Sequence, residues 1–270
     1  MATTYVEMTQ GTPTSQRKFT YSGWIKKCED SPSAHQHIFS AGATSDSYYN
    51  GFRFLTGDAL HINMDSTGSA TWSLTTTRLF RDPTAWYHIV VAIDTTQAVA
   101  ADRMKLYING VQETSFSQTD YPTLNWDFGF MVSGDKIALG RQISGSSEYF
   151  NGDMSHIVFV DGLQLAASYF GETDATSGIW KYKAPDVSAY GTNGFYLRME
   201  DSSNMDLDSS GNAQTFTTTG NLTATKDNPS NNFCTWNPLA VDAGETYVFE
   251  NGNTVCLIPS ASGWSGTSGT

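Results

Sequence analysis

The sequence predicts an all-β protein: a two-sheet antiparallel jelly-roll sandwich with a short C-terminal β-hairpin extension. Short segments of alternating apolar and polar residues recur between turn-forming residues, as strands with one buried face require. Asn-Gly dipeptides separate two pairs of such segments, and no stretch keeps a helical period for three turns. Hydrophobic residues make up 39% of the 270 residues, which is enough to fill a sandwich core.

The clearest hairpin lies between Trp86 and Val111. In each of its two segments, alternate apolar side chains predict a shared core face: Tyr87, Ile89, Val91 and Ile93, then Met104, Leu106 and Ile108. Asn109-Gly110 supplies the two positive-φ positions of a type I′ turn after the second segment. This stretch anchors the fold class and indicates scaffold rather than chemistry.

The other elements follow in chain order. Strands are expected at residues 19–27, 37–41, 51–55, 59–64, 70–74, 136–140, 150–162, 194–200, 214–218 and 222–225. A turn is expected at 65–68, a single helical turn at 165–170 and a second Asn-Gly hairpin at 247–258. Strict alternation in the 150–162 strand places Met154, His156, Val158 and Val160 on one face and Ser155, Ile157 and Phe159 on the other. Both faces are largely apolar, as in a central strand packed on two sides.

Composition suggests one domain with two extensions. Residues 1–16 are polar and are expected to form an N-terminal arm outside the core. Residues 17–237 hold the predicted jelly-roll domain, and residues 238–270 hold the second hairpin and a Gly/Ser tail.

The chain is acidic, with 27 acidic against 15 basic residues and a net charge of −12. Such a surface repels phosphate backbones, so we expect no nucleic-acid partner. No apolar run reaches transmembrane length, and the N-terminus lacks the regions of a signal peptide, so synthesis in a cytoplasm without membrane insertion is expected. Cys28, Cys234 and Cys256 are an odd number without ligand spacing; reduced thiols are expected, with one disulfide plus a free thiol as the alternative.

Several segments resemble laminin-G-like, concanavalin-A-like jelly-roll domains. The resemblance is carried by Ser22-Gly23-Trp24-Ile25-Lys26-Lys27, Trp86-Tyr87-His88-Ile89-Val90, Leu106-Tyr107-Ile108-Asn109-Gly110 and Phe150-Asn151-Gly152-Asp153-Met154. It implies a two-sheet sandwich over residues 17–237, with 150–162 as the closing strand.

A closer resemblance covers residues 12–239 and points to structural proteins of tailed bacteriophages, many of them marine. Its motifs are Phe170-Gly171-Glu172-Thr173-Asp174, Gly178-Ile179-Trp180, Tyr190 to Leu197, Asp208-Ser209-Ser210-Gly211-Asn212 and Asp227 to Phe233. The resemblance implies a virion component, either a tail-fibre or capsid-appendage module that binds host-surface glycans or a capsid decoration protein. It also implies other virion proteins as partners, a homo-oligomer such as a trimer, and release of the virion by lysis.

Enzymatic chemistry is not expected. Hydrolases of this fold carry Glu-x-Asp-x-Glu along one strand, which places nucleophile and acid on one face. The nearest match, Glu172-Thr173-Asp174, lacks the second Glu and lies in a loop. No Gly-x-Ser-x-Gly elbow and no Gly-rich phosphate loop is present. A glycan-degrading enzyme remains the alternative from another class.

The histidines give no zinc constellation. His35 and His37 fall on one face of an extended segment and could pair on a metal, but exposed polar strand residues are the simpler interpretation. His88 and His156 lie inside apolar strands and are expected to be core or hydrogen-bonded residues.

Calcium is the more plausible ion, because laminin-G-like domains often hold calcium at the sandwich rim and hard cations take loop oxygens. The segment 201–212 is rich in carboxylate and carbonyl oxygens, and the candidate ligands are Asp201, Asp206, Asp208 and Asn212. An Asx turn followed by a glycine turn, without an ion, explains the same residues.

Sugar binding needs an exposed aromatic platform with planar polar partners. The candidates for the platform are Trp72, Trp126, Tyr48 and Tyr49, and the candidates for the partners are Asp46, Asn125 and Asp127. The alternative is that both tryptophans pack under loops or at a subunit interface.

Overall fold

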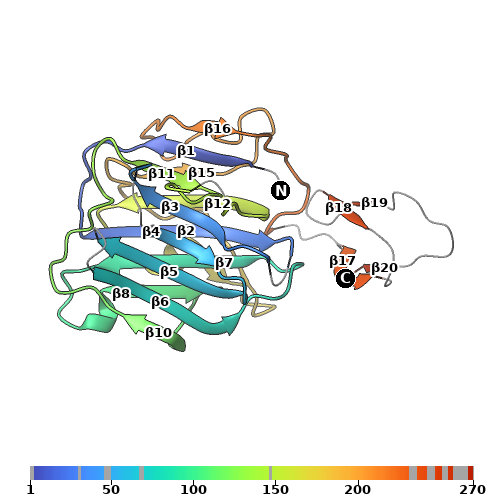
Figure 1. Ribbon diagram of the computed structural model, residues 1–270, viewed down its shortest axis with the longest axis horizontal. Helices are drawn as coiled ribbons and strands as arrows, with labels where there is room; N and C mark the ends of the chain where they lie inside the picture. Colours follow the sequence, from blue (N-terminus) through green and yellow to red (C-terminus); the bar gives the residue numbers. More distant parts are fainter. Residues whose placement is uncertain are drawn as a thin grey trace.

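The computed structural model describes residues 3–29, 32–45, 50–66, 70–145, 148–230, 236–241, 247–250, 255–257 and 267–269. Two antiparallel sheets face each other in these residues and form the predicted sandwich (Figure 1). The all-β prediction is confirmed: helical structure in the described residues is confined to the 3-10 turns η1 (Ala100–Asp102) and η2 (Ala167–Tyr169). None of the described helices is long and apolar enough to span a membrane.

The larger sheet has eight strands in the order β10-β6-β5-β4-β3-β11-β1-β16. In chain order they are β1 (Tyr5–Thr9), β3 (Gln36–Gly42), β4 (Asn50–Phe54), β5 (Ala59–Ser66), β6 (Ala70–Leu79), β10 (Phe116–Asp120), β11 (Lys136–Leu139) and β16 (Thr217–Thr219). Strands β3 to β6 form a meander of neighbours in sequence, whereas β11, β1 and β16 come from distant parts of the chain.

The smaller sheet has six strands in the order β15-β12-β2-β7-β8-β9. They are β2 (Lys18–Lys27), β7 (Tyr87–Asp94), β8 (Met104–Ile108), β9 (Val111–Gln112), β12 (Gly152–Asp161) and β15 (Phe195–Leu197). Its centre, β12-β2-β7, holds the longest ladders, and its inner face covers the larger sheet.

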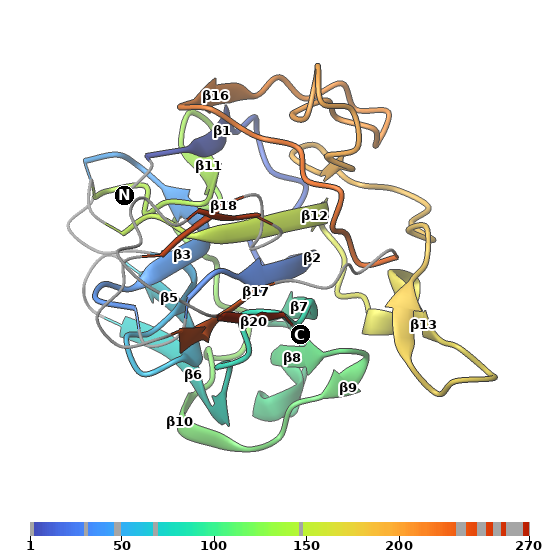
Figure 2. The ribbon, with the colours of Figure 1, turned by 90° about the vertical axis from the view of Figure 1, so that its right-hand side faces the viewer.

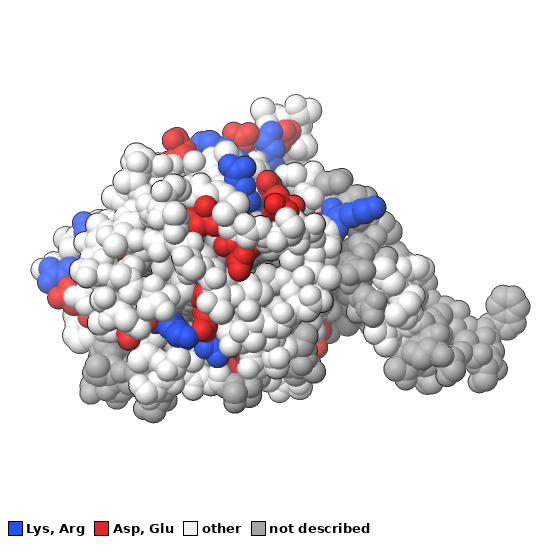
Figure 3. All heavy atoms as spheres, turned by 90° about the horizontal axis from the view of Figure 1, so that it is seen from above, with Lys and Arg blue, Asp and Glu red and all other residues white. Residues whose placement is uncertain are grey.

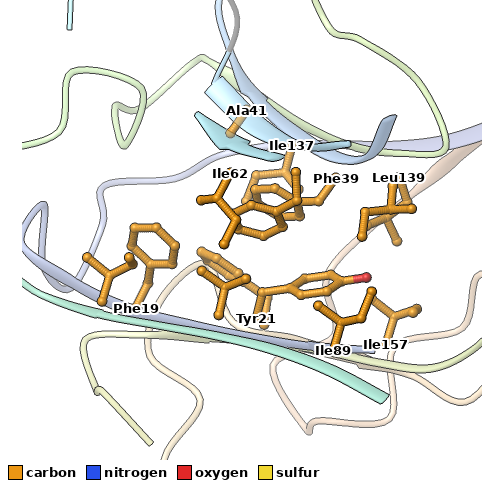
Figure 4. Close-up of a cluster of buried hydrophobic side chains, with 14 of the residues drawn as sticks. Phe19, Tyr21, Phe39, Ala41, Ile62, Ile89, Ile137, Leu139 and Ile157 are labelled. Carbon is orange, nitrogen blue, oxygen red and sulfur yellow. The ribbon is translucent and has the colours of Figure 1, made fainter. Parts of the chain in front are cut away.

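The main core lies between the sheets. Figure 4 shows Phe19, Tyr21, Ile89 and Ile157 of the smaller sheet pointing toward side chains of the larger one, among them Phe39. Phe39 stacks on Phe52 with ring centroids 4.9 Å apart. The inward residues of each strand therefore interdigitate as sandwich packing requires.

The hairpin predicted between Trp86 and Val111 is confirmed. Ile89, Val91 and Ile93 of β7 and Met104, Leu106 and Ile108 of β8 all belong to the main core. Asn109 and Gly110 have φ values of 49° and 81° and connect β8 to β9, with Ile108 opposite Val111. Both positive-φ positions are thus occupied as the type I′ turn demands.

The expectation of a polar arm is wrong for residues 5–9. They form β1, which pairs with β11 on one side and β16 on the other. Val6 and Met8 point into the core and are 2% and 3% exposed. With only two apolar residues in alternation, the strand is too short to stand out from its polar neighbours in the sequence.

The predicted face pattern of the 150–162 strand is partly wrong, because β12 contains a β-bulge. The pairing with β2 shifts register between Ser155 and Val158, and His156 has a φ of 51°. As a result Met154 packs on the main core with Ile157 and Phe159, not on the face of Val158. Both faces are apolar, as expected.

A third layer covers part of the outer face of the smaller sheet. The chain after β12 passes through η2, in the region predicted to be a helical turn, and then forms the hairpin β13 (Gly171–Thr173) and β14 (Trp180–Tyr182). Figure 2 shows β13 beyond the sandwich on this side. Apolar side chains of this layer make a second cluster with the outer face: Val90, Val158, Val160, Ala167, Phe170 and Tyr196.

The C-terminal region contains β17 (Trp236–Val241), β18 (Val248–Glu250), β19 (Val255–Leu257) and β20 (Thr267–Gly269). Strand β18 pairs with β19, so the predicted C-terminal hairpin is present, although its turn lies outside the described residues. The strand expected at 222–225 is absent, since these residues have no regular secondary structure, and in the neighbouring region residues 217–219 form a strand.

Candidate functional site

A groove of about 980 Å³ lies at one end of the sandwich. Its walls are the start of β1, the start of β12 and the segments 199–205 and 221–230, and the end of β2 also contributes. Figure 1 shows the orange segment that follows β16 running down past the end of β12. Strand β15 pairs with β12 only at residues 157–159, so the first half of β12 borders the groove in place of a further strand.

Aromatic side chains and small polar groups alternate on the groove walls. The aromatic residues are Tyr5, Trp86, Phe150, His156 and Tyr182. The amide residues and the Ser and Thr residues are Thr4, Asn151, Ser155, Asn221, Thr223, Thr225, Asn228 and Ser230. This combination of flat apolar faces and planar hydrogen-bonding groups is typical of sites that bind sugars.

The aromatic groups are held in place by specific contacts. The His156 ring stacks on Tyr182 with centroids 3.7 Å apart, and the Tyr182 hydroxyl is 2.7 Å from that of Tyr196. Nδ1 of His156 lies 2.9 Å from the same Tyr196 hydroxyl. The groove wall on this side is therefore a fixed stack, not a set of independent side chains.

The charged groups on the groove walls are acidic: Glu29, Asp153, Glu200 and Asp227. Among the lining residues that the structure describes there is no Lys or Arg. Burial raises the pKa of Asp153 to about 6. Elsewhere, on the face around β1 and β16, charged side chains are few and of both signs (Figure 3).

Asp227 ties the segment 221–230 to the smaller sheet. Its Oδ2 accepts a hydrogen bond from Nζ of Lys26 at 2.5 Å and from the indole nitrogen of Trp86 at 3.2 Å. The side chains of Lys26 and Asp227 are fully buried. This ion pair therefore joins a wall of the groove to β2.

The predicted glycan residues lie elsewhere, and the structure brings some of them together. Trp72 and Trp126 are half-buried and make an edge-to-face contact with ring centroids 5.6 Å apart. Both pack against the main core. Asp127 forms an exposed ion pair with Arg17 at 2.6 Å. Tyr48, Tyr49 and Asp46 lie outside the described residues.

The residues predicted to bind calcium do not form a ligand set. The Asp208 carboxylate accepts backbone N–H groups of Tyr196, Ser210 and Gln214 at 2.8–2.9 Å. Asn212 donates its amide to two carbonyl oxygens, of Gly191 and Gly194.

Asp201 and Asp206 are also taken up by neighbouring groups. Asp201 accepts from Ser203, and Asp206 accepts from the Thr218 hydroxyl. These bonds are those of Asx turns and loop ties, so the donor set does not fit an ion. Within the described ranges no group of three or more His, Cys, Asp or Glu side chains is arranged to hold a metal.

The His35 and His37 pair is not an exposed strand face. His37 is fully buried with Nδ1 3.0 Å from Glu148, and Arg53 lies 3.1 Å from the same carboxylate. Nδ1 of His35 accepts the Thr56 N–H instead. The two imidazoles therefore serve different contacts.

His88 and His156 are hydrogen-bonded residues within the smaller sheet, as predicted. The Glu172 and Asp174 carboxylates both pair with Lys181, and turn N–H groups and Lys181 lower the pKa of Asp174 well below its usual value. The Asp174 carboxyl is therefore not held as an acid. Cys28 and Cys256 are free thiols, while Cys234 lies outside the described residues.

Sequence reasoning missed Trp86, Asp153 and Asp227 as members of one site. Trp86 immediately precedes β7, Asp153 lies on β12, and Asp227 lies in a segment after β16. No local sequence motif joins these three residues. Asp153 follows the Phe-x-Gly motif that marks β12, but its burial depends on residues more than sixty positions later.

The facing sheets and their strand order define a jelly-roll sandwich of the lectin-like class. A family model described as the concanavalin A-like lectin/glucanases superfamily matches residues 1–167. The chain belongs to this superfamily. No curated protein sequence matches it.

The chain is similar to several solved structures at low sequence identity. A native heptameric pentraxin from Limulus polyphemus is 16% identical, with a TM-score of 0.47, over 82% of this chain and 90% of that one. Botulinum neurotoxin type C, whose cell entry depends on interaction with two ganglioside molecules, is 15% identical with a TM-score of 0.43. It covers 61% of this chain, which spans 37% of the toxin chain. A Ruminococcus gnavus sialidase carbohydrate-binding module bound to sialyllactose is 15% identical with a TM-score of 0.39, over 52% of this chain and 73% of that one.

Proposed function

We propose that this chain is a non-enzymatic glycan-binding module and that the groove holds an oligosaccharide. The observation that carries the proposal is the lining, which combines Tyr5, Trp86 and Tyr182 with the amides and hydroxyls of 221–230 over about 980 Å³. Sugar rings stack their apolar faces on aromatic rings and place their hydroxyls against planar polar groups. A volume of this size accommodates a ligand of several sugar units.

The ligand we propose is a neutral glycan. The groove walls carry Glu29, Asp153 and Glu200 and, among the described lining residues, no cationic side chain to meet a sugar carboxylate or sulfate. An anionic sugar would be repelled by these carboxylates and would find no bidentate arginine partner.

The arrangement of the carboxyl groups in the groove indicates glycan binding without cleavage. Retaining hydrolysis needs one carboxylic acid and one free carboxylate on either side of the scissile bond. Asp153 has the raised pKa of an acid, but Asp227 is buried and held by Lys26 and Trp86. A glycan-degrading enzyme therefore stays the second candidate, and release of reducing ends from a polysaccharide would support it.

We further propose that the module belongs to a bacteriophage virion, as a tail-fibre or capsid-appendage protein. The motifs between Phe170 and Phe233 support this through their resemblance to phage structural proteins. The partners would be other virion proteins, copies of this chain in a symmetric oligomer such as a trimer, and a host-surface polysaccharide. Electron microscopy of the virion tests where the protein is located. If it is a capsid decoration protein instead, it would bind the capsid shell and no glycan.

A glycan array with matched variants tests the groove. Thr223 is exposed and lines the groove, so Thr223→Trp fills it without touching the core. The control is Thr176→Trp, at an exposed turn beside β13. We expect binding to neutral glycans that Thr223→Trp abolishes and Thr176→Trp leaves unchanged. If glycan binding were lost only in Trp72→Ala and Trp126→Ala, the binding site would lie at these two tryptophans. If no glycan on the array bound, a capsid decoration protein would be favoured.

A further inference from the structure

Lys26 and Asp227 meet in an unusual setting for a lysine and an aspartate. Nζ of Lys26 is 2.5 Å from Oδ2 of Asp227, both side chains are fully buried, and 201 residues separate them in the chain. A charged pair removed from water is costly, because desolvation competes with the mutual attraction.

A third carboxyl group lies beside this pair. Asp153 on β12 is directly opposite Lys26 on β2 in the strand register, and directly opposite residues project from the same face about 5 Å apart. Its Oδ2 is buried and, in the described part of the chain, has no hydrogen-bond partner. Burial raises the pKa of Asp153 to about 6, and both Lys26 and Asp227 influence it electrostatically. Asp153 is therefore able to hold a proton and to give it up near neutral pH.

Trp86 provides the remaining part of the arrangement. Its indole nitrogen donates to Oδ2 of Asp227 at 3.2 Å, the same oxygen that Lys26 contacts. A fixed N–H donor on a carboxyl oxygen stabilises the negative charge that this oxygen would carry after nucleophilic attack on the carbon. Trp86 thus holds the acceptor carboxyl in place and polarises it.

We propose that Lys26 and Asp227 condense into an intramolecular amide bond, with Asp153 as the group that carries protons between them. Asp153 first carries one proton from Lys26 to Oδ1 of Asp227, and the neutral Lys26 Nζ then attacks Cγ of Asp227 to form a tetrahedral intermediate, whose Oδ2 charge faces the Trp86 N–H. Asp153 accepts a proton from the nitrogen and returns it to the departing Oδ1 hydroxyl. The C–O bond breaks, one water molecule leaves, and Asp153 ends in its starting state. No oxidant, reductant or external reactant takes part.

The groove offers the released water a way out. Asp153, Asp227 and Trp86 all line it, whereas Lys26 lies behind them in the sheet. A covalent bond here would join β2, in the centre of the smaller sheet, to the segment after β16. It would keep the wall 221–230 of the groove fixed to the sandwich.

The neighbouring Lys27 and Asp58 provide a built-in comparison. They are also fully buried and 2.6 Å apart. The Phe80 carbonyl oxygen also lies 2.9 Å from Nζ of Lys27, and the Arg81 guanidinium lies 3.6 Å from Asp58. A backbone carbonyl and an arginine do not relay a proton at neutral pH. We therefore expect this second pair to remain an ion pair.

Intact mass spectrometry of the denatured full chain tests the proposal. The expected mass is lower than the sequence mass by one water molecule. Trypsin should leave Lys26 uncleaved and yield one branched species in which residues 19–27 are joined to the fragment that begins at Asp227. A chain at its full mass, both freshly purified and after prolonged incubation at neutral pH, would overturn the proposal without any variant.

Variants then assign the roles. Lys26→Arg and Asp227→Ala should restore the full mass. Asp153→Asn keeps the shape and both bond partners, so full mass in a cooperatively melting Asp153→Asn chain identifies Asp153 as the proton carrier. An unchanged mass deficit in that variant would remove Asp153 from the reaction. Asp58→Asn, the control at the neighbouring pair, should leave the deficit intact.

Discussion

The indole nitrogen of Trp180 donates a hydrogen bond to Nδ1 of His88 across 3.0 Å. This contact assigns the tautomer, because an Nδ1 that accepts leaves the proton on Nε2, which then donates to Oγ of Ser22 at 2.8 Å. The imidazole also stacks between Trp24 and Trp180. One neutral histidine thus connects β2, β7 and the outer hairpin β13-β14.

This arrangement predicts how stability depends on pH. Burial lowers the pKa of His88 to about 3 from an ordinary value of 6.5. The folded state therefore stays neutral while the unfolded chain takes up a proton, so stability is complete above about 6.5 and declines as the pH falls toward 3. The slope from this group is at most about 1.4 kcal/mol per pH unit. His61 and His156, with pKa values of about 4, act in the same direction.

Urea unfolding at pH 7, 6, 5 and 4 measures this decline. In His88→Gln we expect a lower stability at pH 7 and a shallower decline below it. Asp153 contributes with the opposite sign, since its raised pKa favours the folded state at low pH, but it is common to both chains and cancels in the comparison. If the free energy of unfolding fell equally with pH in the unmodified chain and in His88→Gln, a neutral His88 in the folded protein would be contradicted.

The Asn109-Gly110 turn is a packing surface for Trp180. A Cβ built on Gly110, where φ is +81°, would lie 2.3 Å from Cε3 of Trp180. Gly134 has a similar φ of +94° with open space around it. Ala at either position incurs about 1 kcal/mol of backbone strain, and Gly110→Ala should lose about 1–3 kcal/mol more because the indole must move. If chemical denaturation gave the same loss of unfolding free energy for Gly110→Ala and Gly134→Ala, the Trp180 indole would move aside at no cost.

Strand β1 should contribute to stability like any core strand. Met8 is 3% exposed, and we expect Met8→Ala to lower the free energy of unfolding by about 2–4 kcal/mol. Thr9→Ala, at the exposed end of the same strand, should change it by less than about 0.5 kcal/mol. Guanidinium denaturation measures both, and a negligible effect of Met8→Ala would restore the interpretation of residues 5–9 as an arm.

The Lys27–Asp58 pair should be strongly coupled. Asp58→Asn retains a residue that accepts the φ of 67° but leaves the buried lysine without its carboxylate, at an expected loss of about 3 kcal/mol. The double variant Lys27→Met/Asp58→Asn should recover part of that loss, since no unpaired charge remains. Arg81→Ala, which removes the exposed partner of Asp58, should lose less than about 1 kcal/mol. Additive single and double effects would argue against a coupled pair.

The loop around Asp208 allows calcium to be tested directly. Asp208→Ala leaves the N–H groups of Tyr196, Ser210 and Gln214 without their acceptor, so we expect a loss of about 1–3 kcal/mol. This loss of stability should be the same in calcium and in excess chelator, because the Asp208 carboxylate already accepts hydrogen bonds from backbone N–H groups. A melting temperature of the unmodified chain that falls on chelation would instead support the calcium site.

The sandwich was predictable because its strands carry local signals. The alternation in β7 and β8 and the φ preferences of Asn109 and Gly110 depend only on neighbouring residues. The bulge at His156 was not predictable, since it shifts the register of β12 without an unusual residue at that point. Val6 and Met8 gave too short a pattern to separate a strand from a polar arm.

The candidate groove depends on contacts between distant segments. Asp153 looks like an ordinary polar residue at the start of a strand until Asp227 and its segment cover that strand. Trp72 and Trp126 were separate candidates for a sugar platform because of their aromatic character alone, and the structure brings them into contact. Their half-buried position could not be read from a sequence in which the loops that cover them show no pattern.

The pairing of β1 also sets an order of events during synthesis. This strand is made before both of its partners, and the later one, β16, follows after about 210 residues, roughly 10–40 s at ordinary translation rates. During that interval Val6 and Met8 have no complete sheet to enter. The larger sheet can therefore close only after nearly the whole sandwich has left the ribosome, which makes β1 the natural target for a chaperone that holds the growing chain.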